Sequence, residues 1–367
     1  MPPSQDMNTV GDIIRSEIDR QGIISFARFM ELSLYAPGAG YYETTGQIGR
    51  AGDFYTSISA GPLFGELLGF QFAEWLEEGR GKHIVEAGAH DGQLAADILE
   101  YLREHPRGLA GNIKYWIVEP SVIRREWQRE KLAQFGRQVK WKTGLGKMKD
   151  RAVQGVMFGN ELMDAFPVHR LGWDKRRQAW FEWGVGISGG GLGWERMEPP
   201  SLKALRNGTF QVPRALREHL PDGFITVCNP EAAEWWLDAA GRLGSGRLLA
   251  IDYGLEAEDF FSPERVDGTL RSFSRHQASD DLLANPGRQD ITASVNFSVL
   301  KTMGELAGLS SAPRVSQEKF LMRIFKQTLK QPELFPDWTE ERRRQFQTLT
   351  HPDHLGRPFQ VMVQSRG

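Results

Sequence analysis

The hydrophobic positions near the start of the chain recur with the period of an α-helix. Val10, Ile14 and Ile18 fall on one face of a first short helix. Gly22 interrupts this pattern, and Ser25 is the expected N-cap of a second short helix. Neither stretch alternates as a strand does, so the pattern predicts a helical lobe at the N-terminus.

A loop rich in glycine and aromatic residues is expected over residues 36–56. Beyond it, Pro62 suits the first turn of a helix and Gly79 suits its end. Phe64 and Phe72 would share one face of that helix because they are eight residues apart. The helix is therefore expected to pack by its aromatic face and to lead into a sheet.

From residue 83 onward, short apolar runs alternate with amphipathic helices. This alternation is typical of βαβ units in a parallel sheet. The five strands that it predicts cover residues 83–87, 115–119, 139–141, 155–159 and 247–252. Helices are expected between them, the clearest over 92–103 and 121–135. The pattern as a whole predicts an α/β fold.

The segment between the fourth and fifth strands has a different pattern. Trp180 and Trp183 stand near turn signals there, and three glycines follow at 189–191. We interpret residues 168–193 as an antiparallel meander inserted into the sheet domain. Near the C-terminus, a final strand is expected over 359–363.

Composition limits the possible partners. Of the 367 residues, 40% are hydrophobic and 25% are charged, as in ordinary globular proteins. A formal net charge of −2 gives no excess of basic residues for phosphate contacts, so we assign no nucleic-acid partner. Cys228 is the only cysteine, which excludes an intrachain disulfide and a cysteine-based zinc site. His351, which is followed by Pro352, and His354 stand in an expected loop, and we assign no metal.

Location follows from the same features. A single cysteine fits a reducing compartment, and the first residues lack the basic start and apolar run of a secretory signal. No run approaches the roughly 18 apolar residues that a membrane span needs. We therefore expect a cytoplasmic protein without membrane insertion, and the sequence does not indicate its oligomeric state.

The motif EAGAHDG at 86–92 stands where the first strand ends and a helix begins. Doubly wound sheets bind ligands beyond these strand ends, and small residues let the backbone approach the ligand. His90 occupies the middle glycine position of the G-x-G-x-x-G fingerprint, so a nicotinamide-dependent oxidoreductase is disfavoured. Taken alone, the motif fits either a ligand-binding loop or an ordinary strand-to-helix turn.

Glu119 ends the second predicted strand. An acidic side chain at this place can accept hydrogen bonds from both ribose hydroxyls of a nucleoside ligand. Alternatively, Glu119 caps the helix expected after Ser121. The motif at 86–92 and Glu119 stand at the ends of two consecutive predicted strands. This arrangement favours the interpretation of Glu119 as a residue that binds a nucleoside.

Further motifs extend this evidence along most of the chain, from about residue 35 to residue 325. They are GYY (40–42), GDFYTS (52–57), FG (64–65), GNELMDAFPV (159–168), DYG (252–254), GTLR (268–271), His276 and PGRQDITASVNF (286–297). In these motifs and in their order, the chain resembles the MidA family of class I S-adenosylmethionine-dependent methyltransferases.

The resemblance implies a class I methyltransferase fold, which is a mixed seven-stranded Rossmann-like sheet whose last strand is antiparallel. It implies S-adenosyl-L-methionine as cofactor. In this scheme residues 1–80 form an N-terminal helical lobe with a loop that covers the cofactor, and residues 81–367 form the cofactor-binding domain, with an insertion at about 168–228. The family's mitochondrial member is a complex I assembly factor that methylates a protein arginine. The resemblance therefore implies a protein substrate, with a respiratory complex subunit as a candidate.

The motifs and the resemblance together predict the site residues. Those expected to bind the cofactor are Asp53, Phe54, Thr56, Glu86, Gly88, Ala89, Gly92, Glu119 and Asn160. Asp53 would act in the covering loop, although a turn aspartate is the alternative. The sequence departs from the family at His90, where a second glycine is usual, and we expect the histidine side chain to leave the pocket.

Glu161 and Asp164 follow the fourth strand and are the predicted catalytic residues. A guanidinium nucleophile is hard to deprotonate, so carboxylates that orient it and accept its proton are the chemistry to expect. The alternative is a helix start, where acidic residues favour the N-terminal dipole. At the level of the whole protein, the alternative to an enzyme is a noncatalytic assembly factor that retains the fold.

Overall fold

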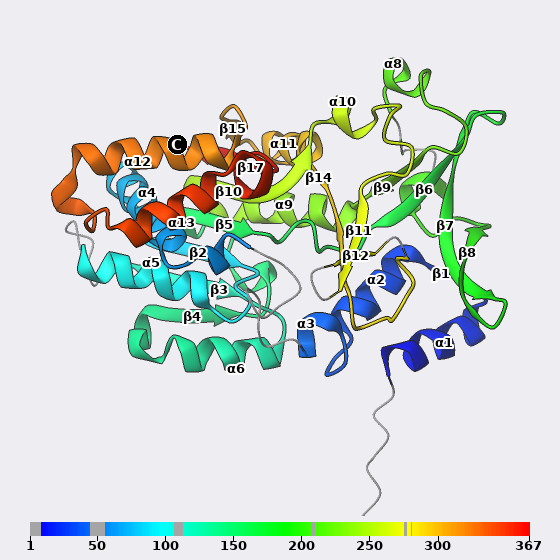
Figure 1. Ribbon diagram of the computed structural model, residues 1–367, viewed down its shortest axis with the longest axis horizontal. Coiled ribbons are helices and arrows are strands. Elements are labelled where there is room, and N and C mark those ends of the chain that lie inside the picture. Colours follow the sequence, from blue (N-terminus) through cyan, green and yellow to red (C-terminus); the bar gives the residue numbers. More distant parts are fainter. Residues whose placement is uncertain are drawn as a thin grey trace, which may run out of the picture. The chain divides into compact units, whose positions relative to one another are not determined.

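The computed structural model describes residues 9–44, 56–105, 113–206, 210, 212–274, 277–279 and 281–367. Asp53 and Phe54, two of the expected cofactor residues, lie outside this part of the chain. The chain divides into two compact units (Figure 1). Unit 1 comprises Met1–Gly46, Ala165–Glu231 and Leu255–Asn296, and unit 2 comprises Gln47–Asp164, Ala232–Gly254 and Phe297–Gly367.

A mixed sheet forms the centre of unit 2. Its strands, in spatial order, are β15 (Ser310–Ser311), β17 (Phe359–Arg366), β10 (Leu243–Leu255), β5 (Val153–Asn160), β2 (His83–Ala87), β3 (Lys114–Val118) and β4 (Val139–Lys142). The five strands from β10 to β4 are parallel, whereas β17 runs antiparallel to β10 and also pairs with β16 (Val315–Ser316). All five residues of β2 are buried, as expected for a central strand whose two faces are covered.

Helices accompany this sheet within unit 2. They are α4 (Leu63–Gly79), α5 (Gln93–Glu104), α6 (Val122–Lys131), α9 (Pro230–Arg242), α11 (Phe297–Leu306), α12 (Gln317–Lys330) and α13 (Glu340–Thr350). Short helical turns are η1 (Ile58–Ala60), η2 (Ala133–Gln138), η3 (Leu145–Lys147), η4 (Pro332–Leu334) and η5 (Pro352–Gly356).

Helices α4 and α5 pack closely because α4 carries two glycines at the crossing. A Cβ atom on Gly65 would lie 2.3 Å from Cβ of Asp97, and one on Gly69 would lie 2.6 Å from the ring of Tyr101. The aromatic face of α4 that the sequence predicted, with Phe64 and Phe72, is fully buried in the core.

Unit 1 contains an antiparallel sheet and several short elements. The sheet has the order β1 (Ile24–Ser25), β7 (Ala179–Ser188), β6 (His169–Asp174) and β9 (Ile225–Cys228), with β8 (Gly191–Met197) paired to β7. A second sheet has the order β12 (Gln277–Ser279), β11 (Leu270–Ser274) and β13 (Asp290–Ala293). The other elements are α1 (Val10–Gln21), α2 (Phe26–Tyr35), α3 (Tyr41–Thr44), α7 (Lys203–Arg206), α8 (Arg214–Arg217), α10 (Ala257–Phe260) and β14 (Val295–Asn296).

Most predicted elements are present. The two N-terminal helices form as expected, with Gly22 at a positive φ of 82° after α1 and Ser25 capping α2 through the N–H of Arg28. The meander is present as β6, β7 and β8. The helix expected over 121–135 is shorter, because α6 ends at Lys131 and a separate turn with a kink at Gly136 follows.

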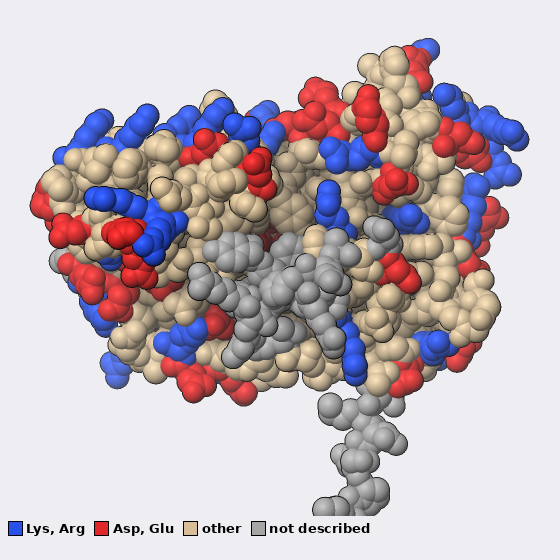
Figure 2. Space-filling view, viewed as in Figure 1, with Lys and Arg blue, Asp and Glu red and all other residues tan. Residues whose placement is uncertain are grey.

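Acidic and basic side chains are interspersed over the face of the molecule shown in Figure 2. Among the described helices, none combines the length and the apolar character needed to cross a bilayer.

Candidate functional site

The carboxyl ends of three adjacent strands in unit 2 bring the predicted site residues together. Ala87, the last residue of β2, pairs with Val118 at the end of β3 and with Gly159 near the end of β5. The residues that follow these strand ends are therefore neighbours at one edge of the sheet. Gly88 and Glu119 are two of them.

The loop after β2 depends on glycine at two positions. Gly88 and Gly92 have φ angles of 73° and 88°, in the left-handed region that L side chains rarely adopt. A Cβ atom on Gly88 would also lie 2.9 Å from Cδ1 of Leu162. Between the two glycines, Ala89 is buried, and Asp91 accepts a hydrogen bond from the N–H of Gln93 at the start of α5. The backbone is thus held in a tight strand-to-helix turn.

His90 adopts a positive φ of 43° between these glycines. Its side chain is largely buried, with its ring 6.1 Å from the ring of Trp127 on α6 and Nδ1 3.9 Å from a carboxylate oxygen of Asp91. Its backbone oxygen accepts a hydrogen bond of 2.8 Å from Nε2 of Gln128. The imidazole therefore packs beside α6, and its carbonyl is fixed.

Glu119 is 1% exposed and is surrounded by donors. Its Oε1 accepts hydrogen bonds from the N–H of Ser121 at 2.9 Å and from Nε of Arg124 at 3.1 Å. Its Oε2 accepts a bond of 3.3 Å from Nε2 of Gln128. The N-cap of α6 is Ser121, whose hydroxyl accepts from the N–H of Arg124, and Glu119 in turn accepts the N–H of this N-cap residue.

Glu86 lies within β2 and is 2% exposed. The hydroxyl of Tyr115 donates a hydrogen bond of 2.6 Å to its Oε2. Burial raises the pKa of Glu86 to about 8, and the nearby carboxylates Asp91 and Asp97 act in the same direction. The structure therefore places this predicted cofactor residue among the core side chains of β2 and β3.

The segment after β5 is a turn in which Asp252 accepts three backbone hydrogen bonds. The N–H groups of Leu162, Met163 and Asp164 donate to Oδ2 of Asp252 at 3.2, 2.9 and 3.3 Å. Glu161 has a positive φ of 50°, which a right-handed helix does not allow. The helix-start alternative for this segment is therefore wrong.

Three carboxylates gather around this turn. Asp252 is fully buried and Asp164 is 5% exposed. Burial, together with the negative charges of Asp164 and Glu161, raises the pKa of Asp252 well above its usual range. Asn160, the last residue of β5, donates from Nδ2 to Oε1 of Glu161 at 3.1 Å. The cluster favours the approach of a cationic group.

Thr56 has a local role in the structure. Its Oγ1 accepts a hydrogen bond from the N–H of Ser59 at 3.3 Å, and its own N–H donates to Oγ of Ser59 at 2.9 Å. These bonds close the turn at η1. Among the described residues, the Thr56 side chain hydrogen-bonds within this turn and not with the strand-end residues.

Asp252, Arg124 and Gln128 contact the site but were not among the predicted site residues. Asp252 could have been found, because it follows an apolar run in the sequence just as Glu119 does. Arg124 and Gln128 are polar residues of a charged helix, and no local pattern distinguishes them from residues that face solvent. Only the packing of α6 shows that Gln128 is buried.

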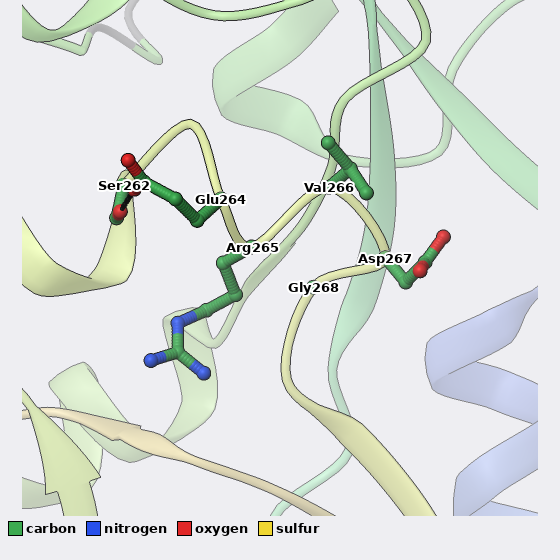
Figure 3. A pocket seen from close by; sticks show the side chains of 6 residues that line it. All are labelled: Ser262, Glu264, Arg265, Val266, Asp267 and Gly268. Carbon is green, nitrogen blue, oxygen red and sulfur yellow. Dashed lines mark hydrogen bonds between the residues drawn. The ribbon is translucent and has the colours of Figure 1, made fainter.

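A pocket of about 290 Å³ lies elsewhere, in unit 1 (Figure 3). It is lined by Ser262, Glu264, Arg265, Val266, Asp267 and Gly268. The guanidinium of Arg265 points away from the carboxylate of Asp267, so these two charges do not converge on one point. None of the predicted site residues within the described part of the chain lines this pocket.

Comparison with known proteins identifies the family. A family model of S-adenosyl-L-methionine-dependent methyltransferases matches residues 67–314. The chain belongs to this family. A crystal structure of a COG1565 superfamily member from Burkholderia thailandensis bound to S-adenosyl-homocysteine is 30% identical, with a TM-score of 0.83 over 97% of this chain and 92% of that one. The class I methyltransferase fold and the cofactor expected from the sequence are thereby confirmed.

Curated relatives extend the comparison. The mitochondrial protein arginine methyltransferase NDUFAF7 of Xenopus tropicalis is 31% identical over 84% of this chain and 73% of its own length. The Danio rerio protein of the same name is 29% identical over 95% of this chain and 84% of its own length. These relatives are mitochondrial, so the expectation of a cytoplasmic location is wrong. Its main physical support, a single cysteine, fits any reducing compartment and cannot distinguish between them.

The residues at the strand ends suit S-adenosyl-L-methionine. His90 Nε2 and Asn160 Oδ1 are buried polar atoms that have no hydrogen-bond partner within the described part of the chain. Buried polar atoms are usually paired, so a polar ligand is a natural partner here. The cofactor supplies an electrophilic methyl group carried on a sulfonium.

Proposed function

We propose that this protein transfers a methyl group to an arginine side chain of a protein substrate, with Glu161 and Asp164 as the catalytic residues. The observation that carries this proposal is the carboxylate cluster after β5, which includes Asp252. It lies next to the glycine loop, because Leu162 contacts the position of Gly88. Relatives named protein arginine methyltransferases support the choice of acceptor.

The proposed chemistry follows from the properties of guanidinium. Its pKa above about 12 keeps it protonated, and its planar fork matches a carboxylate that accepts two parallel hydrogen bonds. Glu161 and Asp164 would orient the guanidinium so that one nitrogen faces the methyl group. The proton released from that nitrogen would be taken up by one of these carboxylates.

On the cofactor side, we propose that Glu119 accepts hydrogen bonds from the ribose hydroxyls. Gly88, Ala89 and Gly92 would provide the close backbone approach, and Asn160 would contact the cofactor near the methyl-transfer site. Glu86 would support the loop from within β2. Thr56, together with Asp53 and Phe54 outside the described residues, would belong to the covering segment.

We further propose a respiratory-complex subunit as the substrate protein. The support is the mitochondrial naming of the relatives and the family resemblance. The test is incubation of the purified protein with S-adenosylmethionine labelled in its methyl group and a lysate of a strain that lacks the gene. Mass spectrometry should find label on arginine of one polypeptide. Label on another residue type would contradict the arginine assignment, and cofactor binding without any labelling would favour the noncatalytic assembly factor.

A further inference from the structure

Gln128 connects three parts of the cofactor side of unit 2. This residue of α6 is 0% exposed. Its Nε2 donates to the backbone oxygen of His90 at 2.8 Å and to Oε2 of Glu119 at 3.3 Å. Its Oε1 accepts a hydrogen bond of 2.9 Å from Nε1 of Trp141 on β4. One buried amide thus joins the glycine loop, the carboxylate after β3 and the neighbouring strand.

The orientation of this amide is fixed by its partners. The indole N–H of Trp141 can only donate, so the atom that faces it must be the amide oxygen. The carbonyl of His90 and the carboxylate of Glu119 accept, so the atom that faces them must be the nitrogen. A flipped amide would lose all three hydrogen bonds. The Gln128 side chain therefore has a single orientation in which all three hydrogen bonds form. In that orientation it holds its three partner groups in place.

We propose that Gln128 is a positioning residue for cofactor binding, which sets the glycine loop and Glu119 relative to each other. The inference rests on the proposed role of Glu119 at the ribose. A ligand that bridges the loop and the carboxylate needs both in register. Ser121 and Arg124 hold one carboxylate oxygen of Glu119, and Gln128 links the other oxygen to the backbone carbonyl of His90. The buried amide places them before the ligand arrives.

The same contact accounts for the histidine in the loop. A residue with a Cβ atom at a φ of 43° is strained relative to glycine, although histidine tolerates this region better than most residues. The hydrogen bond from Gln128 to the carbonyl of His90 offsets this strain by holding the peptide in place. Gln128 thus fixes the backbone at the position where the family usually has glycine.

The first experiment replaces Gln128 by methionine, which keeps the volume and removes all three hydrogen bonds. Gln364 is a matched control in the same unit. It is also 0% exposed, accepts from Nε1 of Trp236 at 2.7 Å and donates to the backbone oxygen of Lys301 and to Ser311. Both variants lose the same kind of buried network, but the hydrogen bonds of Gln364 go to α9, α11 and β15.

The readout is the dissociation constant of S-adenosyl-homocysteine for the full chain by calorimetry, together with the melting temperature. Gln128→Met should weaken binding about tenfold or more, whereas Gln364→Met should change binding less than about twofold at a similar loss of melting temperature. Equal effects of the two variants on binding would overturn the inference. If the wild-type protein does not bind this ligand, the proposed function fails first.

A second variant gives a signature that a merely structural role would not produce. In Gln128→Glu the new carboxylate can still accept from Trp141, but it cannot donate to His90 and it repels Glu119. Binding should be weakest at high pH and should recover as pH falls and the new carboxyl becomes protonated, with no such recovery in Gln128→Met. If binding by Gln128→Glu has the same pH dependence as binding by wild type, the inference is contradicted, even if Gln128→Met fails to fold.

Discussion

Glu119 and Arg124 form a buried ion pair beside the glycine loop. Arg124 Nη2 lies 3.1 Å from Oε1 of Glu119, and the two side chains are 12% and 2% exposed. A carboxylate that is buried needs such a partner, because an isolated buried charge is strongly disfavoured. The arginine therefore gives the buried carboxyl of Glu119 a partner of opposite charge at the position where we propose that the ribose binds.

We predict that Glu119→Ala weakens S-adenosylmethionine binding by about 1.5–3 kcal/mol, as expected for the loss of a charge-assisted hydrogen bond. Calorimetry measures the change. Glu17→Ala is a matched control, because Glu17 is also buried and pairs with Arg28 at 2.9 Å, but in unit 1. The control should lower stability and leave binding unchanged. An unaltered dissociation constant in folded Glu119→Ala would remove Glu119 from the cofactor site.

Glu161 is the residue on which the proposed catalysis depends most. Orienting the acceptor and taking its proton are interactions made most strongly in the transition state. Glu161→Gln should therefore lower turnover by about a hundredfold and leave cofactor affinity nearly unchanged. Turnover is measured by methyl transfer, and affinity by calorimetry on the same preparation. Normal turnover in this variant would show that Glu161 only completes the turn after β5.

At the scale of elements, the close approach of α4 and α5 at their crossing depends on glycine. We predict that Gly65→Ala lowers the free energy of unfolding by about 1–3 kcal/mol, because the new Cβ atom would overlap Cβ of Asp97. Gly79→Ala is the control on the same helix, since nothing lies within 4 Å of the position of its Cβ. That variant should be neutral or slightly stabilising. Denaturant unfolding of both variants tests the prediction, and equal stabilities would show that the helices can shift apart.

The elements that hold the site differ in how far the sequence predicts them. The end of β3 is predictable, because its apolar run is followed directly by Glu119, and the apolar run within β10 is likewise followed by Asp252. The turn after β5 is not predictable, since its backbone N–H groups donate to Asp252, which is 88 residues beyond Asp164 in the chain. The burial of Gln128 is likewise decided by tertiary contacts that leave no local pattern.

At the scale of the whole molecule, the chain builds unit 1 from three separate segments. The buried faces of α1 and α2 in the first segment contribute to one core with Trp173 and Phe224 from the second and Ile291 from the third. A helical period predicts which face of a helix is buried but not which residues cover it. Helical periodicity alone therefore does not predict which segments of the chain make up unit 1.

The stability of the molecule should depend on pH through Glu86. Its pKa is raised to about 8 in the folded protein, mainly by burial. In the unfolded chain the carboxyl loses its proton near its ordinary pKa, so between these two values the folded state binds more protons. Stability from this group is then fully present below the unfolded pKa and is lost as pH rises toward about 8, with a slope of up to about 1.4 kcal/mol per pH unit.

Glu86→Gln tests this dependence, because glutamine cannot ionise and can still accept the hydrogen bond from Tyr115. Denaturant unfolding of both proteins without cofactor, at about pH 5 and about pH 8, gives four free energies of unfolding. Asp97, whose pKa burial raises to about 6, is present in both proteins, so the part of its pH dependence that is due to its own burial is common to both. We expect the variant to gain stability relative to wild type as pH rises, since only wild type must ionise a carboxyl enclosed by β2 and β3. If the free energy of unfolding changes equally with pH in the two proteins, Glu86 is already ionised in the folded state. Its charge among the core side chains would then need another source of compensation.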